Sequence, residues 1–180
     1  MKTRDIDFLI HDPAKLRHEV NIPDLLHDLG FVVIYKGSKG YIKLEHPDLL
    51  LEFLVLEKGK GIDKPFPLPK LGINAVALRF LNFLSSNTIK VKIEDFYVIL
   101  PHPANFALHK LIIFQRRLRQ DKAVKDKNTA IEILRSLIDK GESSIIKQVF
   151  NSIPQKWQKK VMKGLEEAKE KDISSILIGG

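Results

Sequence analysis

The sequence of 180 residues contains no cysteine. Disulfide bonds and thiolate metal sites are therefore excluded. The sequence also lacks an apolar run long enough to span a membrane, and Met1 leads directly into a predicted strand rather than into a signal-peptide pattern. From these absences we expect a cytoplasmic protein that does not act on a membrane.

The remaining composition is typical of a globular protein, with 44% hydrophobic and 29% charged residues. The length suits one ordinary domain, or a small domain with a helical appendage. A formal charge of +8 and a pI near 9.6 favour a polyanionic partner such as a nucleotide or RNA. The alternative is a surface of solvated lysines with no such partner.

The order of the patterns predicts an α/β part followed by a purely helical part. We expect domains at 1–101 and 102–175 and a tail at 176–180. Alternating or continuous apolar runs predict strands, and apolar residues at helical spacing predict helices. The strands are expected at 3–10, 31–35, 41–45, 49–56, 89–93 and 97–100, the first helices at 13–29, 75–84 and 103–120, and a long loop at 58–72.

Asp5 and Asp7 lie two residues apart in the first predicted strand. Strand side chains alternate between two faces, so both carboxylates project from one face while Ile6, Phe8 and Ile10 project from the other. Paired carboxylates on a strand can hold divalent cations against a phosphate chain. The alternative is a half-exposed strand with a solvated acidic face.

Glu52 is the charged residue within the apolar strand predicted at 49–56. An ionised carboxylate on a buried strand is costly unless it is compensated. A metal ion shared with Asp5 and Asp7 would compensate it. The alternatives are an exposed position on an edge strand or an ion pair with a lysine.

Lys110 and Arg117 share roughly one face of the helix predicted at 103–120. A lysine rooted in an apolar helix can direct its ammonium at phosphates, and an arginine can add a forked donor. The alternative is that both stems cover apolar surface while the charged groups reach water.

Taken together, these segments resemble the nucleotidyltransferase fold of the DNA polymerase beta superfamily. The similarity is carried by Thr3–Leu9, by Leu51–Leu54, and by Pro101-His102-Pro103 followed by Lys110, Arg117 and Lys125-Asp126. It spans roughly residues 3–135 and is greatest to small prokaryotic nucleotidyltransferase-like proteins that include abortive-infection type toxins.

The resemblance implies an α+β fold, with a mixed sheet and flanking helices before a C-terminal helical domain. It implies transfer of a nucleotidyl group from an NTP to a hydroxyl of an RNA, a protein or a small molecule, with Mg²⁺ or Mn²⁺ as cofactor. Asp5, Asp7 and Glu52 would be the catalytic metal ligands. Lys110 would contact phosphate, and Arg117 would help to organise the nucleotide side.

The resembling families also place a Gly-Ser pair upstream of the first acidic strand, where it cradles phosphates. Only four residues precede Asp5 here, and Gly37-Ser38 follows the strand. We therefore expect weak metal binding, poor NTP retention and low or absent transfer. This departure keeps two alternatives open: a catalytically impaired protein that binds RNA or protein, and a nuclease that uses the same acids.

Overall fold

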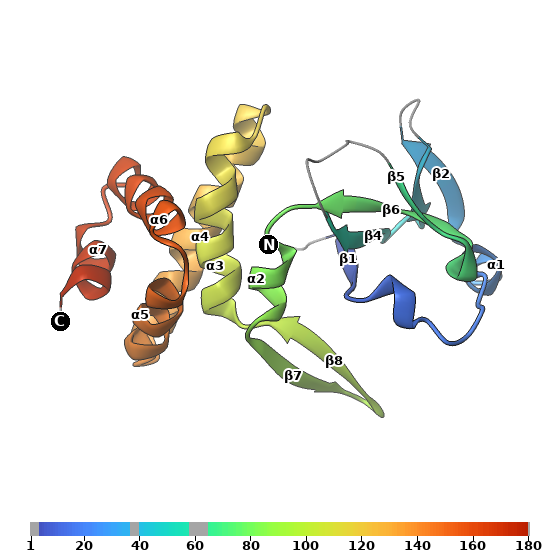
Figure 1. Ribbon diagram of the computed structural model, residues 1–180, viewed down its shortest axis with the longest axis horizontal. Coiled ribbons are helices and arrows are strands. Elements are labelled where there is room, and N and C mark those ends of the chain that lie inside the picture. Colours follow the sequence, from blue (N-terminus) through green and yellow to red (C-terminus); the bar gives the residue numbers. More distant parts are fainter. Residues whose placement is uncertain (1–3, 37–39, 58–64, 180) are drawn as a thin grey trace. The chain divides into compact units, whose positions relative to one another are not determined.

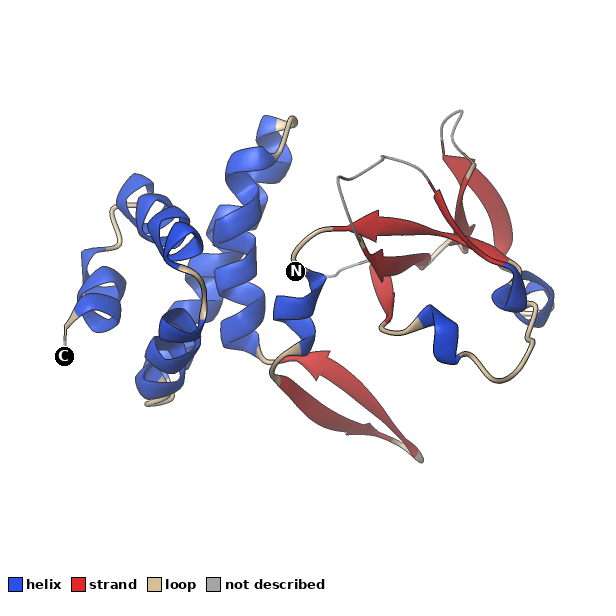
Figure 2. Cartoon of the chain, viewed as in Figure 1, coloured by secondary structure: helices blue, strands red, loops and turns tan. Residues whose placement is uncertain are grey.

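The computed structural model of this chain describes residues 4–36, 40–57 and 65–179. It divides into two compact units between Asn82 and Phe83. The first, called here the sheet unit, contains most of the strands, and the second, called the helical unit, contains one hairpin and most of the helices (Figure 1, Figure 2). The mixed sheet with flanking helices and the C-terminal helical region confirm the expected α+β class.

The sheet unit contains one mixed sheet with the order β2-β3-β4-β6-β5, and β1 pairs with β4. β1 and β6 run parallel to β4, whereas β3 runs antiparallel to it. β4 is thus the strand on which the sheet converges, as its apolar sequence predicts. The elements are β1 (Asp5–Ile10), η1 (Pro13–Lys15), α1 (Ile22–His27), β2 (Val32–Lys36), β3 (Tyr41–Glu45), β4 (Leu50–Leu56), β5 (Pro65–Leu68), η2 (Pro69–Leu71) and β6 (Ile73–Leu78).

One face of this sheet carries the core of the sheet unit. Alternate residues of β3, β4 and β6 are buried there, among them Leu44, Phe53 and Ala75. Leu16, which follows η1, and Leu26 of α1 pack against the same cluster. The segment after β1 therefore covers this face, and the side chains of opposite alternation in β1 and β4 belong to the other face.

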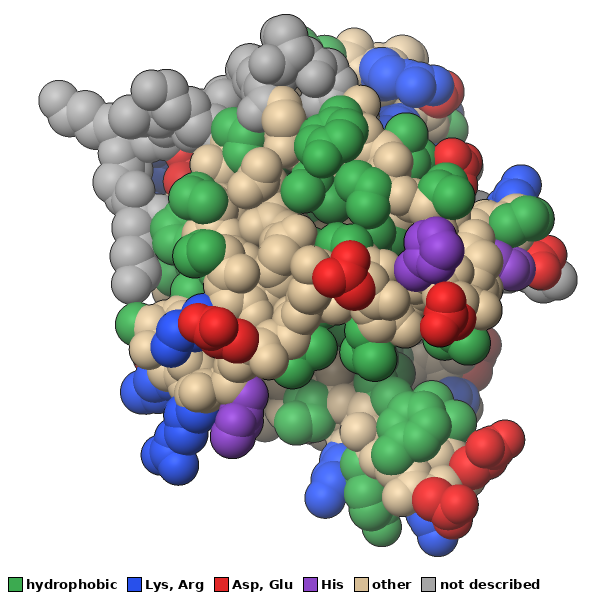
Figure 3. All heavy atoms as spheres, turned by 90° about the vertical axis from the view of Figure 1, so that its right-hand side faces the viewer, with side chains coloured by type: hydrophobic (Ala, Val, Ile, Leu, Met, Phe, Trp, Pro, Cys, Tyr) green, Lys and Arg blue, Asp and Glu red, His purple; other side chains and the backbone are tan. Residues whose placement is uncertain are grey.

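Exposed apolar side chains also lie on the sheet unit, on α1, on the turn after it and on β2. Figure 3 shows hydrophobic side chains gathered on the face that lies to the right in Figure 1. The large apolar residues of these elements that are exposed are Leu25, Leu29, Val32, Val33 and Tyr35.

The helical unit begins with the end of α2 (Leu81–Ser85) and the antiparallel hairpin of β7 (Thr88–Ile93) and β8 (Phe96–Pro101). The hairpin is tied to the next helix, because the backbone N–H of His102 donates to the carbonyl of Asn87 over 2.9 Å. This tie explains why the units divide before the hairpin, whereas the predicted domain division lies near residue 101. The helical segments that follow are α3 (Pro103–Ile113), η3 (Phe114–Arg116), α4 (Gln120–Asp139), α5 (Ser143–Ser152), α6 (Gln155–Glu167) and α7 (Lys171–Ile178).

α3 is the central helix of this unit, since it packs against α4, α5 and α6 and is buried on most of its circumference. α6 approaches α3 at Gly164, where an added Cβ would lie 2.9 Å from Phe114 Cε1 and 3.1 Å from Leu111 Cδ2. A larger residue there would force either the Phe114 and Leu111 side chains or α6 itself to shift.

Several predicted elements differ from those of the structure. The helix expected at 75–84 is right only in its second half: residues 81–84 belong to α2, whereas 75–78 belong to strand β6, because Ile73, Ala75 and Ala77 alternate into the core beside β4. The tail expected at 176–180 is largely helical, since Leu177 in α7 is buried against the helical core. The helix expected at 13–29 is reduced to η1 and the short α1.

Replacing Gly164 with valine should destabilise the helical unit by about 1–3 kcal/mol, the usual cost of overpacking a filled core. Chemical denaturation followed by circular dichroism measures this. Lys163→Val is the matched control, because it adds the same β-branched residue to the same helix at an exposed position. Equal losses in both variants would show that helix propensity, and not the close approach to Phe114, sets the effect.

Candidate active site

The three predicted acids lie on one face of the sheet. The parallel register of β1 and β4 sets Asp7 opposite Glu52 and Asp5 opposite Leu50. Residues opposite each other across two strands point to the same face, and neighbouring strands are about 4.8 Å apart. The acids therefore belong to the face opposite the core of the sheet unit, while Phe8 of β1 stacks on Phe53 of β4 on the core face.

Lys43 lies on the same face as these acids, on the next strand of the sheet, β3. It lies opposite Glu52 in the antiparallel register of β3 and β4, and its ammonium forms an ion pair with the Glu52 carboxylate. The side chains of Lys43 and Glu52 are only 13% and 23% exposed. Sequence reasoning left a lysine partner open for Glu52 but did not identify Lys43, since strand order decides which lysine is adjacent.

The donors on this face fit a magnesium or manganese ion in kind, because both ions prefer carboxylate oxygens. Asp5 and Asp7 lie on an exposed part of β1, which leaves room for a ligand beside them. Within the described ranges, however, no three histidine, aspartate or glutamate side chains are grouped closely enough to hold a metal. Asp5, Asp7 and Glu52 would have to rotate toward a common ion, and Glu52 would share its charge with Lys43.

Lys110 and Arg117 lie in the helical unit and converge on a single carboxylate. Lys110 Nζ donates to Asp126 Oδ1 over 2.6 Å, and Arg117 Nε donates to Asp126 Oδ2 over 2.7 Å. Asp126 belongs to α4, and its side chain is 8% exposed. The single helix predicted at 103–120 is wrong, because α3 ends at Ile113 and Arg117 follows η3 in an extended conformation. The sequence did not assign Lys110 and Arg117 this shared partner.

The charge of Asp126 depends on these two cations. Burial alone would raise the pKa of Asp126, but the hydrogen bonds from Lys110 and Arg117 outweigh it and hold the pKa below its usual value. The resulting stabilisation is present above the ordinary carboxyl pKa and is lost as the pH falls through the lowered one.

His109 is a buried polar residue of α3 that the sequence did not single out as a site. Its Nε2 has no hydrogen-bond partner, and the ring is 7% exposed. Burial, with the nearby Lys110 ammonium adding to it, lowers the pKa of His109 to about 4. The ring is therefore neutral at neutral pH and adds no charge to the cluster around Asp126.

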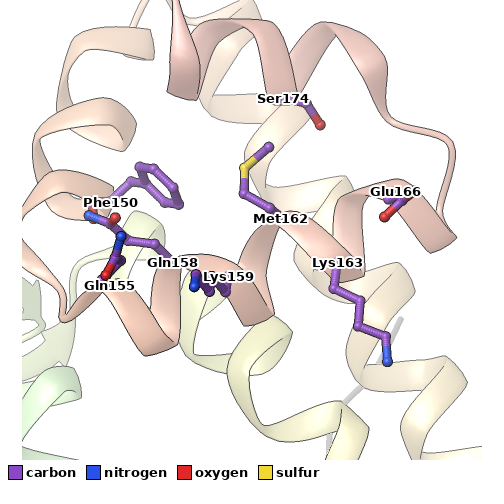
Figure 4. A pocket seen from close by; sticks show the side chains of 8 residues that line it. All are labelled: Phe150, Gln155, Gln158, Lys159, Met162, Lys163, Glu166 and Ser174. Atoms are coloured by element: carbon purple, nitrogen blue, oxygen red, sulfur yellow. The ribbon is translucent and has the colours of Figure 1, made fainter.

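A hollow of about 590 Å³ lies in the helical unit, lined by residues of α5, α6 and α7 (Figure 4). Phe150 and Met162 supply its apolar lining, while Lys159 and Lys163 supply cations from α6. It contains none of the predicted site residues.

A family described as Nucleotidyltransferase matches residues 1–153, which is most of the chain. The chain belongs to this nucleotidyltransferase family. The match covers β1 and β4 with all three acids, and it covers Lys110, Arg117 and Asp126. Comparison with curated proteins gives no match.

Membership in the nucleotidyltransferase family confirms the fold resemblance and supports nucleotidyl transfer as the general activity. The likeness to abortive-infection type toxins stays a prediction, as do the roles of the individual site residues. Gly37-Ser38 and residues 58–64 of the loop expected at 58–72 lie outside the described residues, and the rest of that predicted loop is instead strand β5 and the short helix η2. None of the helices within the described ranges combines the length and apolar character needed to cross a bilayer.

The buried His109 makes the stability of this nucleotidyltransferase depend on pH. In the unfolded chain His109 is protonated below about pH 6.5, whereas in the folded protein it stays neutral down to about pH 4. The free energy of unfolding therefore falls as the pH is lowered through this interval, by roughly 3 kcal/mol at most. Urea denaturation at pH values from 7 to 4.5 measures the loss. His109→Gln should remove this component, and an unchanged pH dependence in the variant would contradict the assignment.

Lys110→Ala should lower the free energy of unfolding by about 1–3 kcal/mol, because Asp126 would retain only one of its two cations. Thermal denaturation measures the change. Lys125→Ala removes an exposed lysine beside Asp126 in the same helix and should have little effect. Equal melting temperatures for Lys110→Ala and wild type would rule out a structural role for the Lys110–Asp126 pair.

Proposed function

We propose that this protein transfers a nucleotidyl group from an NTP to a hydroxyl acceptor with the help of Mg²⁺ or Mn²⁺. The observation that carries the proposal is the register of β1 and β4, which sets Asp7 beside Glu52 on the face away from the core. This arrangement occurs in a chain of the nucleotidyltransferase family, so the family's general chemistry and the placement of the acids support the same reaction.

Asp5 and Asp7 would hold the metal from the exposed strand, and Glu52 would complete the set from the neighbouring strand. A bound divalent ion neutralises charge on the attacking and leaving oxygens of a phosphoryl transfer. The acceptor oxygen bonds to the α-phosphorus while the bond to the pyrophosphate oxygen breaks. Glu52 takes the proton that the acceptor hydroxyl loses.

Lys43 has a positioning role in this proposal. Its ammonium pairs with Glu52, which offsets the cost of keeping a carboxylate on the strand at the centre of the sheet. The pair also restricts the rotamers of Glu52 on the face that it shares with Asp7.

Lys110 and Arg117 would contact phosphate groups from the helical unit. Asp126 holds both cations at 2.6–2.7 Å, so their side chains are ordered before any ligand arrives. The Arg117 side chain is 41% exposed and keeps surface available for a ligand oxygen.

One observation favours a second candidate function. The Lys43 ammonium occupies the Glu52 carboxylate, and a lysine in that position also stabilises the strand without any metal. A catalytically impaired nucleotidyltransferase that binds RNA or protein would retain this pair as a purely structural contact.

The test compares wild type with Asp7→Asn and Glu52→Gln in the presence of labelled NTPs, with Mg²⁺ or Mn²⁺ and with or without RNA. Each variant should lose transfer by at least roughly 100-fold, the effect of removing several kcal/mol of charge stabilisation. Asp28→Asn is the matched control, because it neutralises an aspartate that is 98% exposed.

Transfer that survives in Asp7→Asn would contradict the assigned roles of the acids. No transfer by the folded wild-type chain, with any NTP or either metal, would favour the impaired binding protein. Breakdown of the RNA in place of labelling would indicate a nuclease.

A further inference from the structure

Most of the excess positive charge of this chain lies in the helical unit. Residues 83–180 contain 18 lysines and arginines against 11 aspartates and glutamates, whereas the whole chain has a formal charge of +8. The sheet unit, which carries the candidate active site, is close to neutral by the same count. An excess of this kind on one unit is an electrostatic signature of a surface for polyanions.

α6 gathers four of these cations on one side. Lys156, Lys159, Lys160 and Lys163 follow one another at the helical spacings of three and four residues, so they occupy an arc of about 100°. Val161 and Leu165 of the same helix are fully buried. The lysines therefore form a ridge along the side of α6 that faces away from the core, and this set is called here the lysine ridge.

Packing brings Arg116 to the same ridge. Gln115 Nε2 donates to the carbonyl of Lys160 over 2.9 Å, and Gly164 lets α6 approach Phe114 of η3 closely. The pKa of Lys160 is lowered, first because the ammonium is partly desolvated and then because the cations of Arg116 and Lys156 repel it. A bound anion would reduce the repulsion between these neighbouring cations.

The lysine ridge borders the hollow between α5, α6 and α7. Lys159 and Lys163 belong to both, and Figure 4 shows the Phe150 ring and the Met162 side chain turned toward the hollow, with the Lys163 side chain extending away from it. A volume of about 590 Å³ with an aromatic and a thioether side chain in its lining suits a planar, partly apolar group.

We propose that the lysine ridge and Arg116 bind the phosphate backbone of a single-stranded RNA, with one unstacked base lying in the hollow. Lysines supply point charges for phosphates, and an apolar hollow beside them receives a base that duplex pairing would conceal. An acidic protein would use the cations but would leave the hollow unexplained. That this RNA is the acceptor of the transfer reaction rests on the proposed function; its binding does not.

The experiment measures fluorescence anisotropy of a labelled oligouridylate on addition of the full-length chain at several salt concentrations. The double variant Lys156→Ala/Lys160→Ala should bind roughly tenfold more weakly, and the slope of log affinity against log salt should fall by about 1.4 for two lost contacts. Lys156→Arg/Lys160→Arg should retain binding. Lys140→Ala/Lys171→Ala removes the same charge from exposed positions outside the ridge and should bind within about twofold of wild type.

Equal losses in the ridge variant and the Lys140/Lys171 control would overturn the proposal, because net charge would then be the cause. Absence of binding by wild type, or tighter binding of polyglutamate than of RNA, would overturn it as well. Duplex RNA that binds better than the single strand would overturn the place given to the base. Asp7→Asn separates the two proposals: it should abolish transfer while RNA binding persists, whereas the ridge variant with an RNA acceptor should lose both.

Discussion

The parallel pairing of β1 with β4 is the constraint on which the candidate active site depends. It sets Asp7 opposite Glu52 and Phe8 opposite Phe53, so one register places acids on one face and core residues on the other. A shift of one residue would move both aspartates to the core face and break the stacking of Phe8 on Phe53. The apolar residues of β1 and β4 therefore protect the geometry of the acids, because slipping would cost core burial as well.

Buried carboxylates are paired with cations in both units. Glu52 of β4 pairs with Lys43 of β3, and Asp126 of α4 pairs with Lys110 of α3 and with Arg117 after η3. A largely buried carboxylate needs such partners, since removing one of them leaves its charge less fully compensated. In each case the stabilising contact also orders a side chain that the proposed reaction would use.

The elements that depend on local sequence patterns were predicted correctly, and those that depend on contacts between distant residues were not. The strands at 41–45 and 49–56 and the two hairpin strands before residue 101 were predicted correctly, because alternation and continuous apolar runs are local signals. Residues 75–78 were wrongly assigned to the helix that begins at Leu81, since small and apolar residues fit either period until β4 and β5 are seen to pair with them. Leu177 was placed in a tail because the core residues that bury it come from helices far from it in the sequence.

By itself, the sequence determined the α+β class, the family resemblance and the same-face placement of Asp5 and Asp7, since these depend on composition, order and a period of two. Only the tertiary structure decided that Glu52 lies on that same face beside Lys43, because strand order and register join residues far apart in the chain. It also decided that Lys110 and Arg117 share Asp126, and that η3 brings Arg116 to the lysines of α6. Local periodicity states which way a side chain points within its element, whereas packing alone determines its neighbour.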